Sequence, residues 1–260
     1  MRLIKLFIVI FILFLFISGC EKIEQKVAVT AHRGASGLAP ENTMSAMLRA
    51  IKEGSDFSEL DVQETSDGVI ILLHDHTLQR TSGIEKNIWE MEFANLDGID
   101  VGSWFAPEFT DEPIPTLEAV IDSVRGKMKL NIELKMNGHE KMLEERVLEI
   151  VEKKEFSNDC IFTSFKFEAI DKVKKLNPGI KAGYIFSKMP ERVDVFKANV
   201  DLLSVKYEIV DQEFVEKAHA NNKEVHVWTV NEPEEMKRLI EIGVDSIITD
   251  RPDILVAILK

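Results

Sequence analysis

The chain has 260 residues, a length that suits one domain or a single α/β barrel. Hydrophobic residues make up 45% and charged residues 30%, which is typical of a globular protein with an apolar core and a solvated surface. The net charge of −13 excludes a broadly basic surface that would attract nucleic acid, so we expect no nucleic-acid partner.

The first twenty residues have the pattern of a bacterial lipoprotein signal. Arg2 and Lys5 precede an apolar run of 12 residues, Leu6–Ile17, which is shorter than the ~20 residues of a membrane-spanning helix. The run closes with Ile-Ser-Gly-Cys, which resembles a lipobox and implies cleavage before Cys20 and lipidation of Cys20. A short uncleaved anchor with an incidental cysteine is the alternative.

This pattern divides the chain into a signal peptide (residues 1–19), a short linker from lipidated Cys20 (residues 20–26) and one folded domain (residues 27–260). Loss of the signal peptide removes two basic residues and no acidic one, which changes the net charge from −13 to −15. Membrane attachment would then come from acyl chains rather than from a basic patch, in the bacterial cell envelope outside the cytoplasm. Cys160 is the other cysteine of the chain, so we expect no intramolecular disulfide. The sequence carries no signal for an oligomeric state.

From residue 27 onward, short apolar runs alternate with longer amphipathic segments. The runs predict strands at Val27–Ala31, Phe57–Val62, Val69–Leu73, Lys129–Glu133, Cys160–Thr163, Lys181–Ile185, Leu202–Val205, Glu224–Trp228 and Ser246–Ile248. The amphipathic segments predict helices, for example at Thr43–Lys52, Glu140–Lys153, Phe167–Leu176, Gln212–Ala220 and Pro233–Ile242. Alternation of this length favours a parallel sheet, either closed or open.

Nine strand candidates are one more than an eight-stranded barrel needs, and the link at residues 65–68 explains the excess. This link is too short for a parallel crossover, and its Asp-Gly pair favours a hairpin turn. We therefore expect Val69–Leu73 to return antiparallel beside Phe57–Val62. A hairpin centred near Asp67 would place His74 beside Leu60 and Asp61.

Residues 77–115 interrupt the alternation with several glycines and prolines and with the aromatic residues Trp89, Trp104 and Phe105. This composition predicts an insertion of loops with little regular structure of its own. Such an insertion can be a lid or binding loop, or it can be a packed surface excursion, and the sequence leaves both open.

Polar residues stand at the ends of four successive predicted strands. In chain order they are His32 and Arg33, Glu59 and Asp61, His74, and Glu133 with Lys135. Residues two apart on a strand share one face. In a barrel the carboxyl ends of the strands meet at one mouth, where the active sites of such folds lie.

Together these residue types favour phosphate-ester chemistry. Three converging carboxylates would repel one another without a partner, and oxygen ligands suit a hard cation such as Mg²⁺ or Ca²⁺. Arg33 and Lys135 add the fixed positive charge that binds phosphate. His32 and His74 titrate near neutral pH and can supply a proton donor and a proton acceptor. Each motif alone is common in proteins without such a role, so the interpretation depends on their combination.

The chain also resembles a known family. The motifs that carry the resemblance are, in order, Ala31–Gly34, Pro40–Thr43, Glu59–Val62, Thr65–Gly68, His74–Asp75, Gly102–Phe105, Ile114–Leu117, Ile132–Lys135, Val227–Asn231 and Thr249–Pro252. They resemble the signature of the glycerophosphodiester phosphodiesterases over about residues 28–258.

The resemblance implies a TIM-type (β/α)8 barrel of the phosphatidylinositol-phospholipase-C-like type, with a small insertion at about residues 77–115. It implies metal-dependent hydrolysis of glycerophosphodiesters to glycerol 3-phosphate and an alcohol. Carried over position by position, it makes Glu59, Asp61 and Glu133 the ligands of one divalent cation, His32 and His74 the acid–base pair, and Arg33 and Lys135 the phosphate ligands.

Other assignments leave alternatives open. Trp228 is expected to bind substrate at the mouth, against the glycerol carbons, with a place in the core as the alternative; Asn42 or Thr43 is expected to cap the following helix. The nucleophile is water or the glycerol 2-hydroxyl, and either histidine can be the base.

Two further functions compete with this one. The first is phospholipase-D-type hydrolysis of lysophospholipids or sphingomyelin at the same site, and the second is capture of phosphodiesters without catalysis. An exposed apolar rim around the mouth would favour a lipid substrate, whereas a tight polar pocket would favour a soluble diester.

Overall fold

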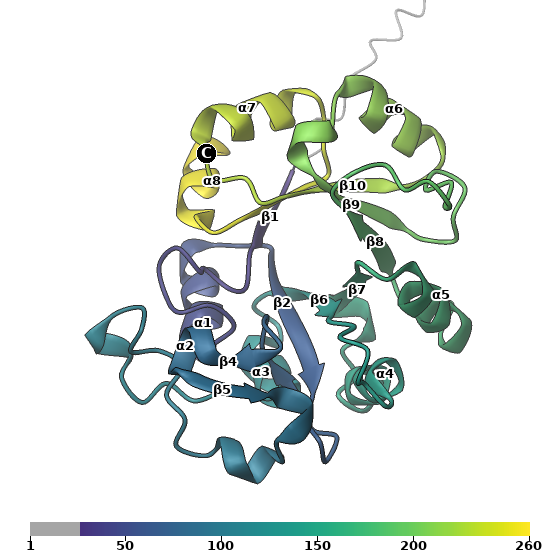
Figure 1. Cartoon of the computed structure of the whole chain (residues 1–260). Helices are drawn as coiled ribbons and strands as arrows, with labels where there is room; N and C mark the ends of the chain where they lie inside the picture. Colours follow the sequence, from purple (N-terminus) through teal and green to yellow (C-terminus); the bar gives the residue numbers. More distant parts are fainter. Residues whose placement is uncertain (1–26) are drawn as a thin grey trace, which may run out of the picture.

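The computed structural model describes residues 27–260, so Cys20 and the rest of the predicted signal and linker lie outside the described residues. Within this range, parallel strands close into a barrel with the helices outside it (Figure 1). The eight strands of the barrel are β1 (Ala28–Ala31), β2 (Phe57–Glu64), β6 (Lys129–Leu134), β7 (Cys160–Ser164), β8 (Ala182–Phe186), β9 (Leu202–Lys206), β10 (Glu224–Trp228) and β11 (Ser246–Thr249). The barrel closes because β1 pairs with both β11 and β2. The predicted TIM-type fold is confirmed.

The outer layer consists of short helices between the strands. They are α1 (Met44–Glu53), α3 (Leu117–Val124), α4 (Leu143–Lys153), α5 (Phe167–Leu176), α6 (Gln212–Ala220), α7 (Pro233–Glu241) and α8 (Pro252–Ile258), with 3-10 turns η4 (Ser157–Asp159) and η5 (Tyr207–Ile209). The link between β8 and β9, residues 187–201, contains no helix. No helix in residues 27–260 is long and apolar enough to cross a membrane.

Alternation along each strand separates the core from the site. On β6, Leu130, Ile132 and Leu134 belong to the apolar cluster that also contains helix residues, whereas Asn131 and Glu133 line a cavity inside the barrel. This follows from the two-residue period of a strand, which sends successive side chains to opposite faces. The outward apolar side chains pack against the helices, and the inward polar side chains form the candidate site.

The predicted hairpin is present. The short strand β3 (Ile70–Leu72) runs antiparallel to β2, with Val62 opposite Leu72. Gly68 has the positive φ of 89° that favours glycine at this turn. The backbone N–H of Leu73 donates to the carbonyl of Asp61 at 3.0 Å, so the chain delivers His74 beside the middle of β2 as expected.

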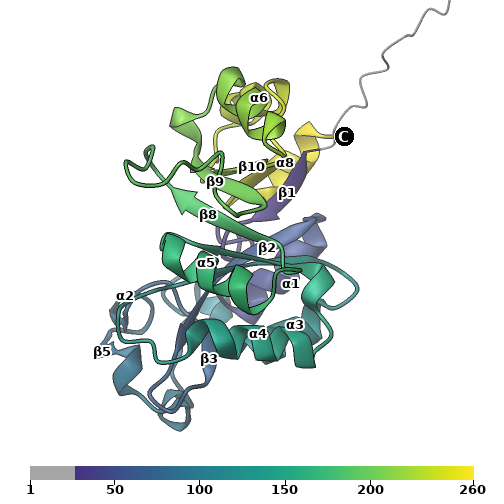
Figure 2. The same ribbon diagram turned by 90° about the vertical axis from the view of Figure 1, so that its right-hand side faces the viewer.

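The insertion at residues 77–115 has short elements: β4 (Thr77–Leu78), α2 (Gln79–Ser82), β5 (Ile84–Asn87) and the 3-10 turns η1 (Ile88–Glu90), η2 (Phe93–Leu96) and η3 (Pro107–Phe109). Its buried residues Leu78, Ile88 and Leu96 form a second apolar cluster with Ile71 and Leu73 of the hairpin. The insertion is therefore packed onto the barrel. It lies on the side toward which β8 points, which is the side of the mouth (Figure 2).

Candidate active site

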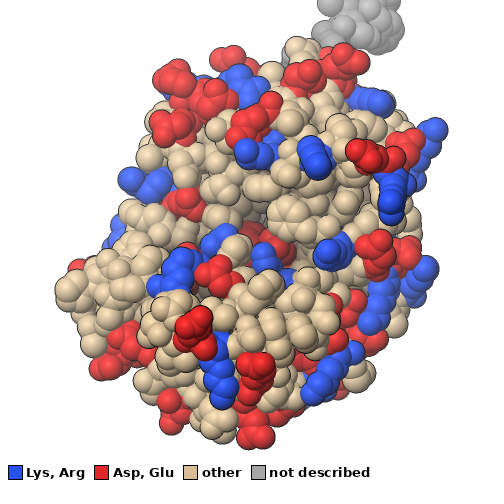
Figure 3. Space-filling view, in the orientation of Figure 1, with Lys and Arg blue, Asp and Glu red and all other residues tan. Residues whose placement is uncertain are grey.

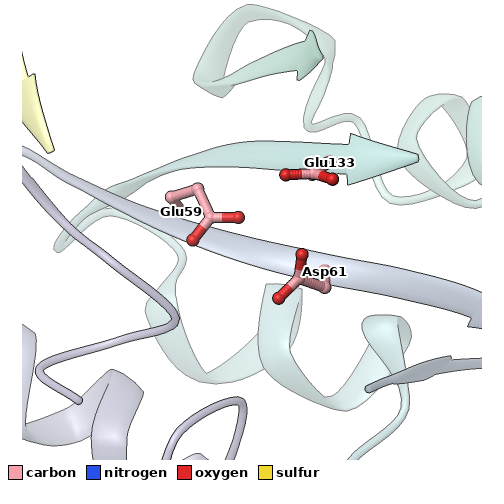
Figure 4. Close-up of side chains that lie close together, drawn as sticks. All are labelled: Glu59, Asp61 and Glu133. Atoms are coloured by element: carbon pink, nitrogen blue, oxygen red, sulfur yellow. The ribbon is translucent and has the colours of Figure 1, made fainter. Parts of the chain in front are cut away.

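Three carboxylates converge inside the mouth of the barrel. Glu59 and Asp61 project from β2 and Glu133 from the neighbouring β6, where it stands opposite Asp61 (Figure 4). One oxygen from each residue lies within 4.8 Å of the others. The residues are 4%, 1% and 8% exposed, so water screens their repulsion poorly.

Burial and mutual repulsion shift the pKa values within this cluster. Burial, followed by the charges of Asp61 and Glu133, raises the pKa of Glu59 well above its ordinary value. Burial and Asp61 raise the pKa of Glu133 to about 7. Burial would also raise the pKa of Asp61, but Lys135 and Arg33 hold it below its ordinary value. The cluster therefore concentrates more negative charge than its own surroundings neutralise.

The cluster fits a divalent cation. The donors are carboxylate oxygens, which suit a hard ion. Within residues 27–260, the buried Oε1 of Glu59 has no hydrogen-bond partner, so it is available as a ligand. Asn42 steadies a second ligand because its Nδ2 donates to Asp61 Oδ2 at 2.8 Å.

Two basic side chains border the carboxylates. The Nζ of Lys135 lies 2.9 Å from Glu133 Oε1 and 3.5 Å from Asp61 Oδ1. The Nε of Arg33 lies 3.4 Å from Asp61 Oδ2, and its backbone N–H donates to Glu59 Oε2 at 2.8 Å. The tight turn that sets Arg33 requires Gly34, since a Cβ there would lie 2.5 Å from the Cβ of Ala46.

His32 is held by a carboxylate from the last strand end of the barrel. Its Nδ1 lies 2.7 Å from Asp250 Oδ1, and its Nε2 lies 4.0 Å from Glu59 Oε2. Asp250 also accepts from Ser36 Oγ at 2.8 Å and from Asn231 Nδ2 at 2.6 Å. Burial would raise the pKa of Asp250, but these hydrogen bonds lower it to about 2, so the carboxylate stays ionised. Because Nδ1 is engaged with Asp250, Nε2 is the ring nitrogen that can exchange a proton with a molecule in the cavity.

His74 has a carboxylate partner of its own. Its Nδ1 lies 2.7 Å from Asp75 Oδ1, and Asp75 Oδ2 accepts from Arg80 Nε at 2.7 Å. Arg80 also donates two hydrogen bonds to Glu41, and Glu41 accepts another from Arg33. Ion pairs therefore connect Arg80 of the insertion to Arg33, a predicted phosphate ligand. Burial, with help from Lys135 and Arg33, lowers the pKa of His74 although Asp61 opposes the shift.

These groups surround a cavity of about 150 Å³. Its lining includes His32, Arg33, Glu59, His74, Glu133, Phe165 and Trp228. A space-filling view shows a hollow near the centre of this face, in which acidic and basic side chains meet (Figure 3). Trp228 stands edge-on to Phe165, with ring centroids 5.5 Å apart, and its buried Nε1 has no hydrogen-bond partner within the described chain.

The structure thus places all eight predicted site residues of the barrel in or beside one cavity. Comparison with known proteins decides the family: residues 32–254 match the sequence profile described as the glycerophosphoryl diester phosphodiesterase family. The chain belongs to that family. It is an enzyme of the phosphodiesterase class.

Relatives agree with this assignment over nearly the whole chain. A glycerophosphodiester phosphodiesterase of Caldanaerobacter subterraneus is 33% identical over 90% of this chain and 98% of its own length. An Oleispira antarctica phosphodiesterase, solved with the product sn-glycerol-3-phosphate, is 30% identical with a TM-score of 0.83, over 88% of this chain and 95% of that one. A lysophospholipase D of Rattus norvegicus is 26% identical over 85% of this chain and 82% of its own.

Sequence reasoning missed several members of this phosphodiesterase site. Asp250 and Asn231 lie within the family motifs, but no spacing rule links them to His32. Asn42 was expected as a possible helix cap; Thr43 makes the cap, accepting from the N–H of Ala46, and Asn42 binds Asp61. Arg80 carries no local signal because Glu41, which binds it with two hydrogen bonds, lies 39 positions away in the chain.

The raised pKa of Glu133 predicts a pH-dependent loss of stability in the metal-free enzyme. A carboxyl with a raised pKa in the folded state binds its proton more tightly there than in the unfolded chain. Its stabilising contribution is therefore full below its ordinary pKa of 4.5 and is lost as the pH rises to about 7. We expect Glu133→Gln to flatten the fall in unfolding free energy over this range, measured by urea titration after chelation.

The control is Glu149→Gln, which removes one carboxylate from the exposed face of α4. It should follow the pH dependence of the unmodified protein. Parallel pH profiles for the unmodified protein and Glu133→Gln would contradict the raised pKa.

Proposed function

We propose that the enzyme hydrolyses glycerophosphodiesters to glycerol 3-phosphate and an alcohol, with one divalent cation and a pair of histidines. The observation that carries this proposal is the meeting of three buried carboxylates, two basic side chains and two aspartate-paired histidines around one cavity. A phosphodiester brings one negative charge and two ester oxygens to such a site. The arrangement matches both needs, since it has cations for the phosphate and two proton carriers for the esters.

Binding falls to the basic and aromatic groups. Arg33 offers a planar donor group and Lys135 a compact charge for the phosphate oxygens. Trp228 lines the cavity and would offer its apolar ring to the glycerol carbons. Glu59, Asp61 and Glu133 would hold the cation, for which we propose Mg²⁺ or Ca²⁺ from the oxygen-only donor set. When bound, the cation supplies charge neutralisation and Lewis acidity to the phosphate.

Proton transfer falls to the two histidines. One Nε2 takes the proton of the nucleophile as its oxygen bonds to phosphorus, and the other donates a proton to the oxygen of the leaving alcohol as that P–O bond breaks. The aspartates at Nδ1 fix the ring orientations and stabilise the protonated ring. With water as nucleophile the products form in one displacement. With the glycerol 2-hydroxyl a cyclic phosphate forms first and water opens it.

The proposed roles predict large and separate losses at the two histidines. His32→Ala and His74→Ala should each lower kcat by ~10²–10⁴-fold while the far-UV spectrum and cation binding survive. The double variant should lose less than the product of the two because the groups act as a unit. A His74→Ala enzyme with near-normal kcat on glycerophosphocholine would defeat the proposal.

A second candidate function, phospholipase-D-type cleavage of lysophospholipids, is favoured by a specific feature of the mouth. Phe165, Met189 and Ile209 follow the adjacent strands β7, β8 and β9 and are 44%, 48% and 36% exposed. Phe165 also lines the cavity. These side chains could accommodate an acyl chain that leaves the site, and the lysophospholipase D of the rat shares the family.

For location we propose a lipid-anchored envelope protein. The support is the Leu6–Ile17 run with the lipobox-like sequence at Cys20. The first strand, β1, enters the barrel at the end opposite the mouth (Figure 2). The proposed anchor would therefore join the folded domain at the end of the barrel opposite the mouth.

Loss of the acylated thiol tests this location. Cys20→Ser should release the protein from the membrane fraction or leave the precursor unprocessed, as seen by fractionation and by labelling with a radioactive fatty acid. Unchanged association that only detergent reverses would favour an uncleaved anchor instead.

A further inference from the structure

Gln63 is a buried amide that the proposed mechanism does not use. It follows Glu59 and Asp61 on the inner face of β2, at the same two-residue spacing, and it is 0% exposed. A side chain of this polarity is rarely buried unless its hydrogen-bonding groups are all engaged. The partners of Gln63 therefore indicate its role.

The acceptors of the Gln63 amide N–H groups are the backbone carbonyls of His74 and its two neighbours. The Nε2 of Gln63 donates to the carbonyl oxygens of Leu73 at 2.8 Å and Asp75 at 2.7 Å, and it lies 3.3 Å from the carbonyl of His74. The Oε1 of Gln63 accepts from Asn137 Nδ2 at 3.1 Å. The Gln63 amide thus connects the backbone of residues 73–75 to the loop after β6 by hydrogen bonds.

The backbone of residues 73–75 has left the sheet, so other hydrogen bonds must fix its position. The β2–β3 ladder ends with the bond from the Leu73 N–H to the Asp61 carbonyl, and residues 73–75 then leave the sheet. His74 and Asp75 sit on this departing segment, and their mutual contact requires a fixed backbone. Two short bonds from one donor group to carbonyls on either side of His74 leave the segment little freedom.

We propose that Gln63 is a positioning residue for His74: it fixes the backbone of residues 73–75 so that Nδ1 meets Asp75 and Nε2 faces the phosphate. This inference rests on the proposed acid–base role of His74. Gln63 is not among the residues that line the cavity, and within residues 27–260 its side chain has no hydrogen bond to the predicted phosphate ligands Arg33 and Lys135. Its effect should therefore pass through His74 alone.

The test is a double-mutant cycle that combines Gln63→Met with His74→Ala. Gln63→Met keeps the side-chain length and removes both N–H donors of the amide. On glycerophosphocholine we expect kcat to fall by about 10²-fold, the cost of displacing a catalytic group by about 1 Å, with KM little changed. In a His74→Ala background the same change should lower kcat by less than about twofold, because the group it positions is gone. A purely structural role would lower activity equally in both backgrounds.

Asn137→Ala is a second, milder variant at a half-buried position, and it should lower kcat several-fold in the same His74-dependent manner. Thr116→Ala is the matched control: it removes the N-cap of α3, where Thr116 Oγ1 accepts from the N–H of Ala119, and should leave kcat unchanged.

Two results overturn the inference. One is an unchanged kcat in Gln63→Met or, where that variant does not fold, in Asn137→Ala. The other is an equal loss in the presence and absence of His74. Normal kcat in His74→Ala alone would instead overturn the proposed function, so the two failures are distinguishable.

Discussion

The structure depends on burying three carboxylates side by side between β2 and β6. Register forces the contact, because Asp61 stands directly opposite Glu133 and Glu59 precedes Asp61 by two residues on the same face. Such a cluster destabilises a fold unless positive charge compensates it. Lys135 and Arg33 supply part of that charge from the ends of β6 and β1, and a divalent cation would supply the rest. With such a cation bound, the ion, Arg33 and Lys135 would together offer positive charge to a phosphodiester.

Two oriented histidines are the second requirement, and barrel closure supplies one of them. His32 at the end of β1 meets Asp250 after β11 because the first and last strands pair, although the two residues are 218 positions apart. His74 reaches the same cavity by a different route, on the segment that leaves the β2–β3 hairpin. The closed barrel and the local hairpin therefore bring the two histidines to one cavity by separate routes.

Much of the fold and several site residues were predictable from local sequence patterns. Apolar runs located the barrel strands to within one or two residues, and the Asp-Gly turn explained the ninth strand, because these signals are local. The helices α3 and α8 were not identified, since eight and seven residues give too few turns for a clear amphipathic period. Asp250 and Arg80 were missed as site residues because their contacts depend on barrel closure and on the fold of the insertion. Sequence spacing identified groups that share a strand, whereas partners from distant segments required the tertiary structure.

The proposed reaction needs a divalent cation and breaks the P–O bond to the alcohol, so that the phosphate stays on the glycerol. The most direct measurement is phosphorus NMR of the products formed from glycerophosphocholine and, in parallel, from lysophosphatidylcholine, before and after chelation and after addition of Mg²⁺ or Ca²⁺. The account predicts that glycerophosphocholine yields glycerol 3-phosphate, that chelation stops the reaction and that the added cation restores it. Hydrolysis of lysophosphatidylcholine to a lysophosphatidic acid would support the second function at the same site. Phosphocholine as the product, or full activity after exhaustive chelation, would contradict the account.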